Sequence, residues 1–142
     1  MAAGEGILAN GMMLEYSAAG SVWTELEDMK EIGAPGSPTA NTVDVTPLKQ
    51  TGRSRFKRRG LYDNGTFPFK QFYSSDRYAA LKAIKDADNP YHWRVTLPDG
   101  AKFTFVGELN KCVPPTGDDP ETALLIDCEV TVTGEITFTE AA

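Results

Sequence analysis

The sequence has few of the residues from which metal centres and covalent catalytic sites are built. It contains two cysteines, Cys112 and Cys128, one histidine, His92, and no Cys-x-x-Cys pair. A structural zinc site needs about four Cys or His ligands at close spacing, so this composition argues against one. His92 falls on the polar face of a predicted strand with no acid or nucleophile beside it, which favours a surface residue over a catalytic base.

Further absences narrow the function. No apolar run approaches the length of a membrane span, and no charged segment with an apolar core opens the chain. Nucleophile motifs and Gly-rich phosphate loops are missing, and paired acids such as Asp118-Asp119 fall in loops where solvation accounts for them. We therefore expect no enzyme activity, no cofactor, no metal and no membrane partner, and we expect reduced thiols in a cytosolic site of assembly.

The length and composition of the chain are those of an ordinary globular domain, apart from one unusual segment. The 142 residues, of which 41% are hydrophobic, predict a single domain over 1–142 with a core of its own. Residues 1–11, rich in Gly and Ala, predict a flexible N-terminus. The net charge of −6 argues against general affinity for nucleic acid.

The unusual segment is 34–59, a Gly- and Pro-flanked stretch that is poor in apolar residues. Six of the fourteen cationic residues fall within eleven positions that contain no acid. Such an excursion is either a solvated loop or an arm, and its charge complements the acidic remainder of the chain, as head-to-tail association requires. The six cations are Lys49, Arg53, Arg55, Lys57, Arg58 and Arg59.

The remaining pattern predicts strands around one helix. A capping signal at residues 74–76 opens a helix that runs to about Ala87, where Asn89-Pro90 ends it. Residues 91–97 and 103–109 alternate as a hairpin about a Pro-Asp-Gly turn. Residues 12–16 predict a short strand, and 22–32 are ambiguous between helix and strand, with strand favoured. Asp63-Asn64-Gly65 is a turn signal before a strand that starts at Phe67.

The final segment alternates most clearly. Ile126, Cys128, Val130, Val132, Ile136 and Phe138 share one face, and the opposite face is acidic and rich in threonine. Because the phase continues through Gly134, one long strand with a bulge and a tight hairpin are both compatible with the pattern. The acidic face, with Asp127, Glu129 and Glu135, suits either solvent or the wall of a channel that must not retain a polyanion.

Two motifs and their order resemble the major tail tube proteins of long-tailed bacteriophages. Residues 43–48 read Val-Asp-Val-Thr-Pro-Leu, like the segment that ends a strand in that family. A short loop later, Gly60, Leu61, Asp63 and Gly65 match the Gly-Leu-x-Asp-x-Gly turn into the next strand. The order of strand, arm, strand, helix, hairpin and closing strand also resembles the family over most of 14–139. Arg59 departs from the pattern, because the family often has Pro there.

The resemblance implies a mainly β (α+β) fold: an antiparallel β-sandwich or barrel with one flanking helix and a long arm. It implies a structural virion protein whose hexameric rings stack into the tail tube through which double-stranded DNA passes without specific binding. The implied partners are further copies and the tape-measure, tail terminator and baseplate proteins, and assembly takes place in the host cytoplasm. On this basis Arg53, Arg55, Lys57, Arg58 and Arg59 are expected to reach an adjacent ring, and Asp127, Glu129 and Glu135 to line the lumen.

Three alternatives stay open from the sequence. A tube-forming component of a secretion system would share the architecture, and a tail terminator would stop at one ring. A carbohydrate-binding β-sandwich of an adsorption apparatus would instead present aromatic rings to sugars, with Trp23, Tyr91 and Trp93 as candidates.

Overall fold

A computed structural model describes residues 10–49, 51–87, 89–117 and 119–140 of the protein. The predicted flexible segment 1–11 therefore lies almost entirely outside the described residues. The elements in chain order are β1 (Met13–Ser17), β2 (Thr24–Leu26), β3 (Met29–Ile32), β4 (Thr39–Asp44), β5 (Lys57–Asp63), β6 (Thr66–Phe72), α1 (Ser75–Asp86), β7 (Tyr91–Thr96), β8 (Lys102–Val113) and β9 (Leu125–Thr139).

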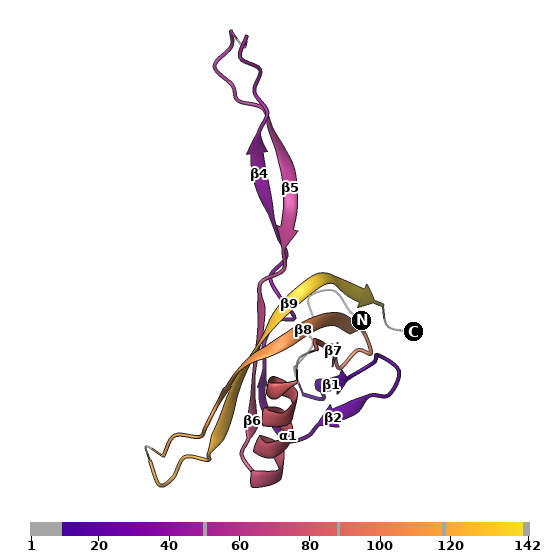
Figure 1. Cartoon of the computed structure of the whole chain (residues 1–142), viewed down its shortest axis with the longest axis vertical. Coiled ribbons are helices and arrows are strands. Elements are labelled where there is room, and N and C mark those ends of the chain that lie inside the picture. The colour runs from indigo at the N-terminus through magenta and orange to yellow at the C-terminus, as the bar shows by residue number, and fades with distance from the viewer. Residues whose placement is uncertain (1–9, 50, 88, 118, 141–142) are drawn as a thin grey trace, which may run out of the picture.

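Seven of the strands form one antiparallel sheet in the order β2-β1-β7-β8-β9-β6-β3. The sheet curls into a half-barrel, and α1 lies against it (Figure 1). Strands β4 and β5 pair with each other in a separate two-stranded sheet that extends far from this body. The expected mainly β fold with one flanking helix is confirmed.

The core fills the space between the curled sheet and the helix. Ser74 caps α1 by accepting a hydrogen bond at its Oγ from the Arg77 amide at 3.2 Å. Leu81 and Ile84, three residues apart and so on one face of the helix, are its buried side chains. They join a cluster whose other buried members are Leu14, Leu26, Phe67, Phe69, Trp93, Val95, Phe105, Leu109, Ile126, Cys128 and Val130.

Strand β9 is one continuous strand of 15 residues, which decides between the two alternatives that the sequence left open. Opposite β9, Thr104 pairs with Thr137 and Val106 pairs with Thr133, so β9 has two extra residues around Gly134. An insertion of two residues preserves the alternation of side chains, since the period of a strand is two. For this reason the apolar residues of β9 stay on one face on both sides of the bulge.

A second irregularity lies on β8, where Leu109 pairs with Val130 but Lys111 pairs with Glu129. Here β8 has one extra residue, Asn110, whose side chain donates to the Thr131 hydroxyl at 2.6 Å. A single inserted residue exchanges the two faces of a strand. Cys112 therefore points to the core side, although it is out of phase with Phe105 and Leu109.

Two local expectations need correction. Residues 22–32 form two short strands, β2 and β3, and not a single strand, because Asp28 between them adopts a left-handed conformation with φ 52°. In the predicted Gly-Leu-x-Asp-x-Gly turn, Gly60 and Leu61 belong to β5, and only Asn64 and Gly65 separate β5 from β6.

Candidate functional site

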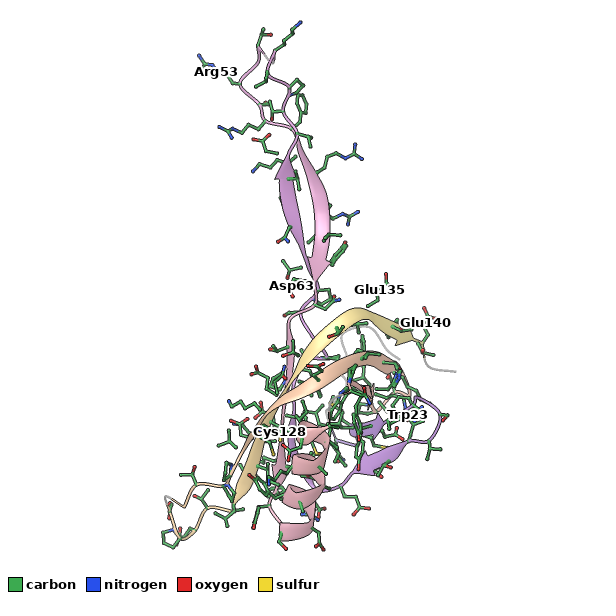
Figure 2. All side chains as sticks on the ribbon, viewed as in Figure 1. Trp23, Arg53, Asp63, Cys128, Glu135 and Glu140 are labelled. Atoms are coloured by element: carbon green, nitrogen blue, oxygen red, sulfur yellow. The ribbon has the colours of Figure 1, made fainter. Side chains whose placement is uncertain are left out.

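The most exposed structure of the molecule is the arm, which we define as the β4–β5 hairpin and its tip, residues 39–63. Figures 1 and 2 show it standing clear of the half-barrel, with side chains projecting on both sides. The predicted segment was 34–59, so the arm begins five residues later, where β4 starts at Thr39. It also ends four residues later, because β5 continues through Tyr62 and Asp63. An isolated two-stranded hairpin is only marginally stable in water, so a partner surface is expected for it.

Local hydrogen bonds order the base of the arm tip. The Asp44 carboxylate accepts from the Thr46 amide at 2.9 Å and from Arg55 at 3.1 Å. The Thr46 hydroxyl in turn accepts from the Phe56 amide at 2.8 Å. Hydrogen bonds from the hydroxyl and amide of Thr46, and a smaller one from Arg55, lower the pKa of Asp44 below its usual value of 3.8.

The cations of the arm occupy both faces of its ribbon. Lys57 and Arg59 alternate with Arg58 along β5, so their side chains leave opposite faces of the ribbon. In the described part of the arm, only Arg55 makes an ion pair within 4 Å, with Asp44. The arm carries six cations and two acids, and the rest of the chain carries eight cations and eighteen acids. The protein is thus divided into a segment of charge +4 and a remainder of charge −10.

The arm also exposes large apolar side chains. Leu48 and Leu61 are almost fully exposed, and four other large apolar residues of the arm are at least 44% exposed. Six of the eleven exposed large hydrophobic residues identified in the described chain fall within these 25 positions, which is more than a solvated loop requires. The six are Val43, Val45, Leu48, Phe56, Leu61 and Tyr62.

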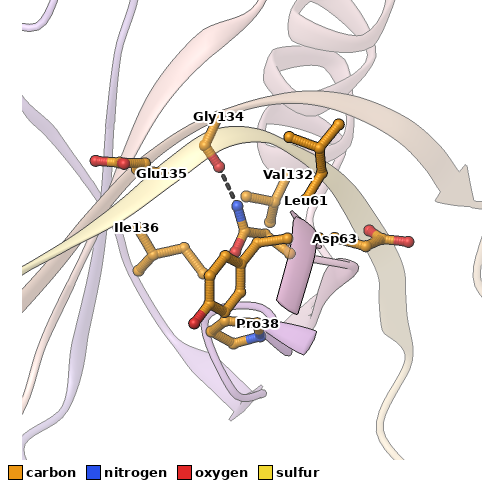
Figure 3. A pocket seen from close by; sticks show the side chains of 10 residues that line it. Pro38, Leu61, Asp63, Val132, Gly134, Glu135 and Ile136 are labelled. Carbon is orange, nitrogen blue, oxygen red and sulfur yellow. Dashed lines mark hydrogen bonds between the residues drawn. The ribbon is translucent and has the colours of Figure 1, made fainter. Parts of the chain in front are cut away.

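A groove of about 660 Å³ lies where the arm meets the body (Figure 3). Its walls are the end of β5 on one side and the bulge of β9 on the other, and Asn64 bridges them by donating from its side chain to the Gly134 carbonyl. Two acids, Asp63 and Glu135, are among its lining residues. The other lining residues are Pro38, Gly60, Leu61, Tyr62, Val132 and Ile136.

The groove brings together residues that sequence reasoning had assigned to different roles. Gly60, Leu61 and Asp63 came from the turn motif, whereas Glu135 came from the predicted lumen set. The turn itself is held by the Asp63 carboxylate, which accepts from the Gly65 amide at 2.9 Å, and by Gly65 at φ 69°. Nothing in the sequence predicted Pro38, Val132 and Ile136 in a groove. Its one relevant feature was Gly134, which interrupts the alternating pattern of the final strand.

The other two acids of the predicted lumen set lie elsewhere on β9. Asp127 and Glu129 are half-buried on the face that points away from the core. Asp127 is 3.6 Å from the ammonium of Lys111, and Lys70 is its cross-strand neighbour on β6. The face is therefore of mixed charge at Asp127. Among the described residues, neither Glu129 nor Glu135 makes an ion pair within 4 Å.

The aromatic residues considered for sugar binding do not form a platform. Trp93 is fully buried, and its indole N–H donates to the Gly107 carbonyl at 3.1 Å. The Trp23 ring is covered by the Arg94 guanidinium at 4.3 Å, which also binds Glu15 at 2.8 Å and 3.1 Å. Trp93, a candidate under the carbohydrate-binding alternative, is not available to stack on a sugar, because the strand places its ring on the core face.

Within the ranges that the structure describes, no three Cys, His, Asp or Glu side chains group as a metal site would need. None of the described helices combines the length and the apolar character needed to cross a membrane. The arm and the groove at its base remain as the candidate site, with exposed cations and exposed large apolar side chains close together on the arm.

No protein-family model matches the chain, and no curated protein has significant sequence similarity to it. Solved structures do match. One is a chain of an extracellular contractile injection system, described as the PVC sheath/tube terminator in the extended state. It has a TM-score of 0.75 at 7% identity, over 98% of this chain and 100% of that one.

A second match is a chain of the anti-feeding prophage (AFP) baseplate, 6-fold symmetrised, with a TM-score of 0.71 at 6% identity over 98% and 97% of the two chains. A third comes from the tail of an empty GTA particle with C6 symmetry, with a TM-score of 0.68 at 16% identity over 91% and 96%. The protein therefore has the fold found in components of phage-like tails and contractile injection systems.

Proposed function

We propose that this protein is the structural subunit of a tail tube, in which hexameric rings stack and the arm of one subunit contacts a subunit of the adjacent ring. The observation that carries the proposal is the arm itself. It combines unpaired cations with large exposed apolar side chains on a hairpin that stands free of its own body. Such a surface is costly to leave in water and is stabilised when a partner covers it.

The charge division supports a second copy of the chain as that partner. The arm is positive and the remainder is strongly acidic, so the arm of one subunit is attracted to the body of another. A contact between two different surfaces of identical subunits is heterologous, and when it does not close on itself it propagates into a filament. The 6-fold arrangement of the AFP baseplate and the C6 symmetry of the GTA tail support six subunits in each ring.

The edges of the body sheet support lateral association. Strands β2 and β3, of three and four residues, form the two edges of the seven-stranded sheet. Free strand edges invite pairing with other chains, and a closed ring satisfies them without leaving an end. In this proposal the half-barrels of neighbouring subunits complete one continuous wall.

The experiment is electron microscopy of negatively stained protein over a concentration series, together with light scattering. The wild-type chain is expected to form hollow tubes of uniform width. The Arg58→Glu/Arg59→Glu variant is expected to form at most single rings, because repulsion replaces attraction at the contact between rings. Lys82→Glu/Lys85→Glu, on the exposed face of α1, is the matched control and is expected to form tubes. Tubes of normal length from the arm variant would contradict the proposal.

A tail terminator is the second candidate, and the match over the full length of the PVC sheath/tube terminator favours it. A terminator stops at one ring, since its function is to end a tube. The same microscopy separates the two candidates: rings that never stack at any concentration favour the terminator, and tubes exclude it. The assignment to long-tailed phages in particular, with location in the virion tail and contact with tape-measure and baseplate proteins, remains part of the proposal.

We further propose that the outward face of β9 contributes to the lumen, where acidic side chains repel the DNA that passes. Asp127, Glu129 and Glu135 carry this role, although Lys111 partly neutralises the first of them. Tubes of the triple variant Asp127→Asn/Glu129→Gln/Glu135→Gln are expected to assemble normally and to retain double-stranded DNA at low salt. Equal DNA retention by variant and wild-type tubes would remove these residues from the lumen.

A further inference from the structure

The two cysteines of the chain lie directly opposite each other, although 15 residues separate them in sequence. Cys112 on β8 is the direct cross-strand partner of Cys128 on β9. Both are free thiols in the structure. The extra residue Asn110 on β8 creates this pairing, because it turns Cys112 onto the core face that Cys128 occupies.

Direct opposition on neighbouring antiparallel strands brings the two cysteines into the range of Cα separations from which a disulfide forms. Residues directly opposite on antiparallel strands have Cα atoms about 4.5–5.5 Å apart, and a disulfide accepts roughly 4.4–6.8 Å. The two side chains leave the same face of the sheet. A disulfide here would close a loop that contains the whole β8–β9 connection, which extends beyond the body at the end opposite to the arm (Figure 1).

We propose that Cys112 and Cys128 form a site of reversible oxidation, at which a low-molecular-weight disulfide converts the two thiols into an intramolecular disulfide at the base of the β8–β9 loop. Cys112 is half-buried and Cys128 fully buried, so Cys112 is the first to react. Its thiolate attacks one sulfur of the small disulfide and displaces one small thiolate. Cys128 then loses its proton and attacks the Cys112 sulfur, which releases the second small thiol.

The net reaction oxidises two protein thiols and reduces one small disulfide to two thiols, so atoms and electrons balance. Burial raises the pKa of both cysteines, which makes the exchange slower than at an exposed cysteine. The site is then expected to stay reduced in a cytosol and to oxidise after prolonged exposure to an oxidising medium. This inference does not depend on the proposed tube.

The test is to incubate the folded full-length chain with oxidised glutathione and to analyse it without reducing agent. We expect an intact mass lower by two hydrogens, a monomeric band, and a peptide that links residues 112 and 128. We also expect a rise in Tm on the order of 10 °C that dithiothreitol reverses. Cys112→Ser removes the attacking thiol and should abolish the mass change while Cys128 stays unmodified.

Three results would overturn the inference. A stable glutathione adduct on Cys112 with no internal disulfide would show that Cys128 cannot reach it. A disulfide-linked dimer would show that Cys112 pairs between chains. An internal disulfide that appears only when denaturant is present would show that the folded strands do not permit the bond.

Discussion

The arm and the body are both antiparallel β-structure, yet different forces hold them together. The body buries Trp93, Phe67 and Phe105 at 2% exposure or less, so its stability comes from an apolar core. The arm has no such core, and its order rests on a two-stranded ladder and on surface hydrogen bonds around Asp44 and Thr46. The body thus has an apolar core that holds it together, whereas the arm has none of its own.

The largest effect that separates the two regions is expected from truncating a large side chain in each. Trp93→Ala removes the central core ring and its hydrogen bond to the Gly107 carbonyl, and it should cost about 3–5 kcal/mol of unfolding free energy. Leu48→Ala in the arm, where the side chain is fully exposed, should change stability by less than about 0.5 kcal/mol. Urea denaturation followed by tryptophan fluorescence of Trp23 and circular dichroism measures both. If the two variants lost similar amounts of unfolding free energy, the side chain of Leu48 would contribute to the stability of the body, and the contrast between arm and body would be wrong.

An intermediate effect is expected from adding a single methyl group. A Cβ at Gly107 would lie 2.6 Å from the Thr131 carbonyl oxygen and 2.6 Å from a Val130 methyl, so Gly107→Ala forces β8 and β9 apart. The expected loss is about 1–3 kcal/mol. Gly117→Ala is the control, because nothing lies within 4 Å of a Cβ there, and it should be neutral. Thermal unfolding of the two variants gives the comparison, and an unchanged Tm for Gly107→Ala would refute the close packing of these strands.

The smallest effect is expected at the arm tip and depends on pH. Because contacts in the folded arm lower the pKa of Asp44 below 3.8, its charge stabilises the tip above the unfolded pKa. That contribution is lost as the pH falls through the lower folded pKa. Hydrogen exchange at the Thr46 and Phe56 amides, relative to unstructured rates, should quicken a few-fold upon acidification, while core amides change little. Asp44→Asn should abolish this dependence on pH; a dependence that persists would assign it to another group.

Periodicity made much of the body predictable. The helix over 75–86, the hairpin of β7 and β8, and the apolar face of β9 each appear in the sequence as a period of 3.6 or 2, because burial on one face selects apolar residues at that spacing. The arm was visible as a charge anomaly. Its strands were visible only in part: segment 43–48 was expected to end a strand, but the start of β4 and the extent of β5 were not expected, since both strands bury little and no core imposes an alternation on them.

The groove at the base of the arm was beyond prediction for a related reason. Its walls come from β5 and from β9, about 70 residues apart in the chain, and no local pattern specifies that the two meet. The placement of Glu135 on the same groove as Asp63 follows from the bulge at Gly134, and the size of a bulge is set by pairing with the neighbouring strand. Sequence alone assigned these acids to separate roles.

By itself, the sequence indicated a β-rich fold with one helix, and the division of charge between a basic arm and an acidic remainder. These depend on composition and on local period, which each segment carries independently of the others. Only the tertiary structure decided that Asn110 is an inserted residue, and therefore that Cys112 faces Cys128. The register between two strands is a property of the pair, because hydrogen bonds and packing across the ladder select it, and neither strand contains that information alone.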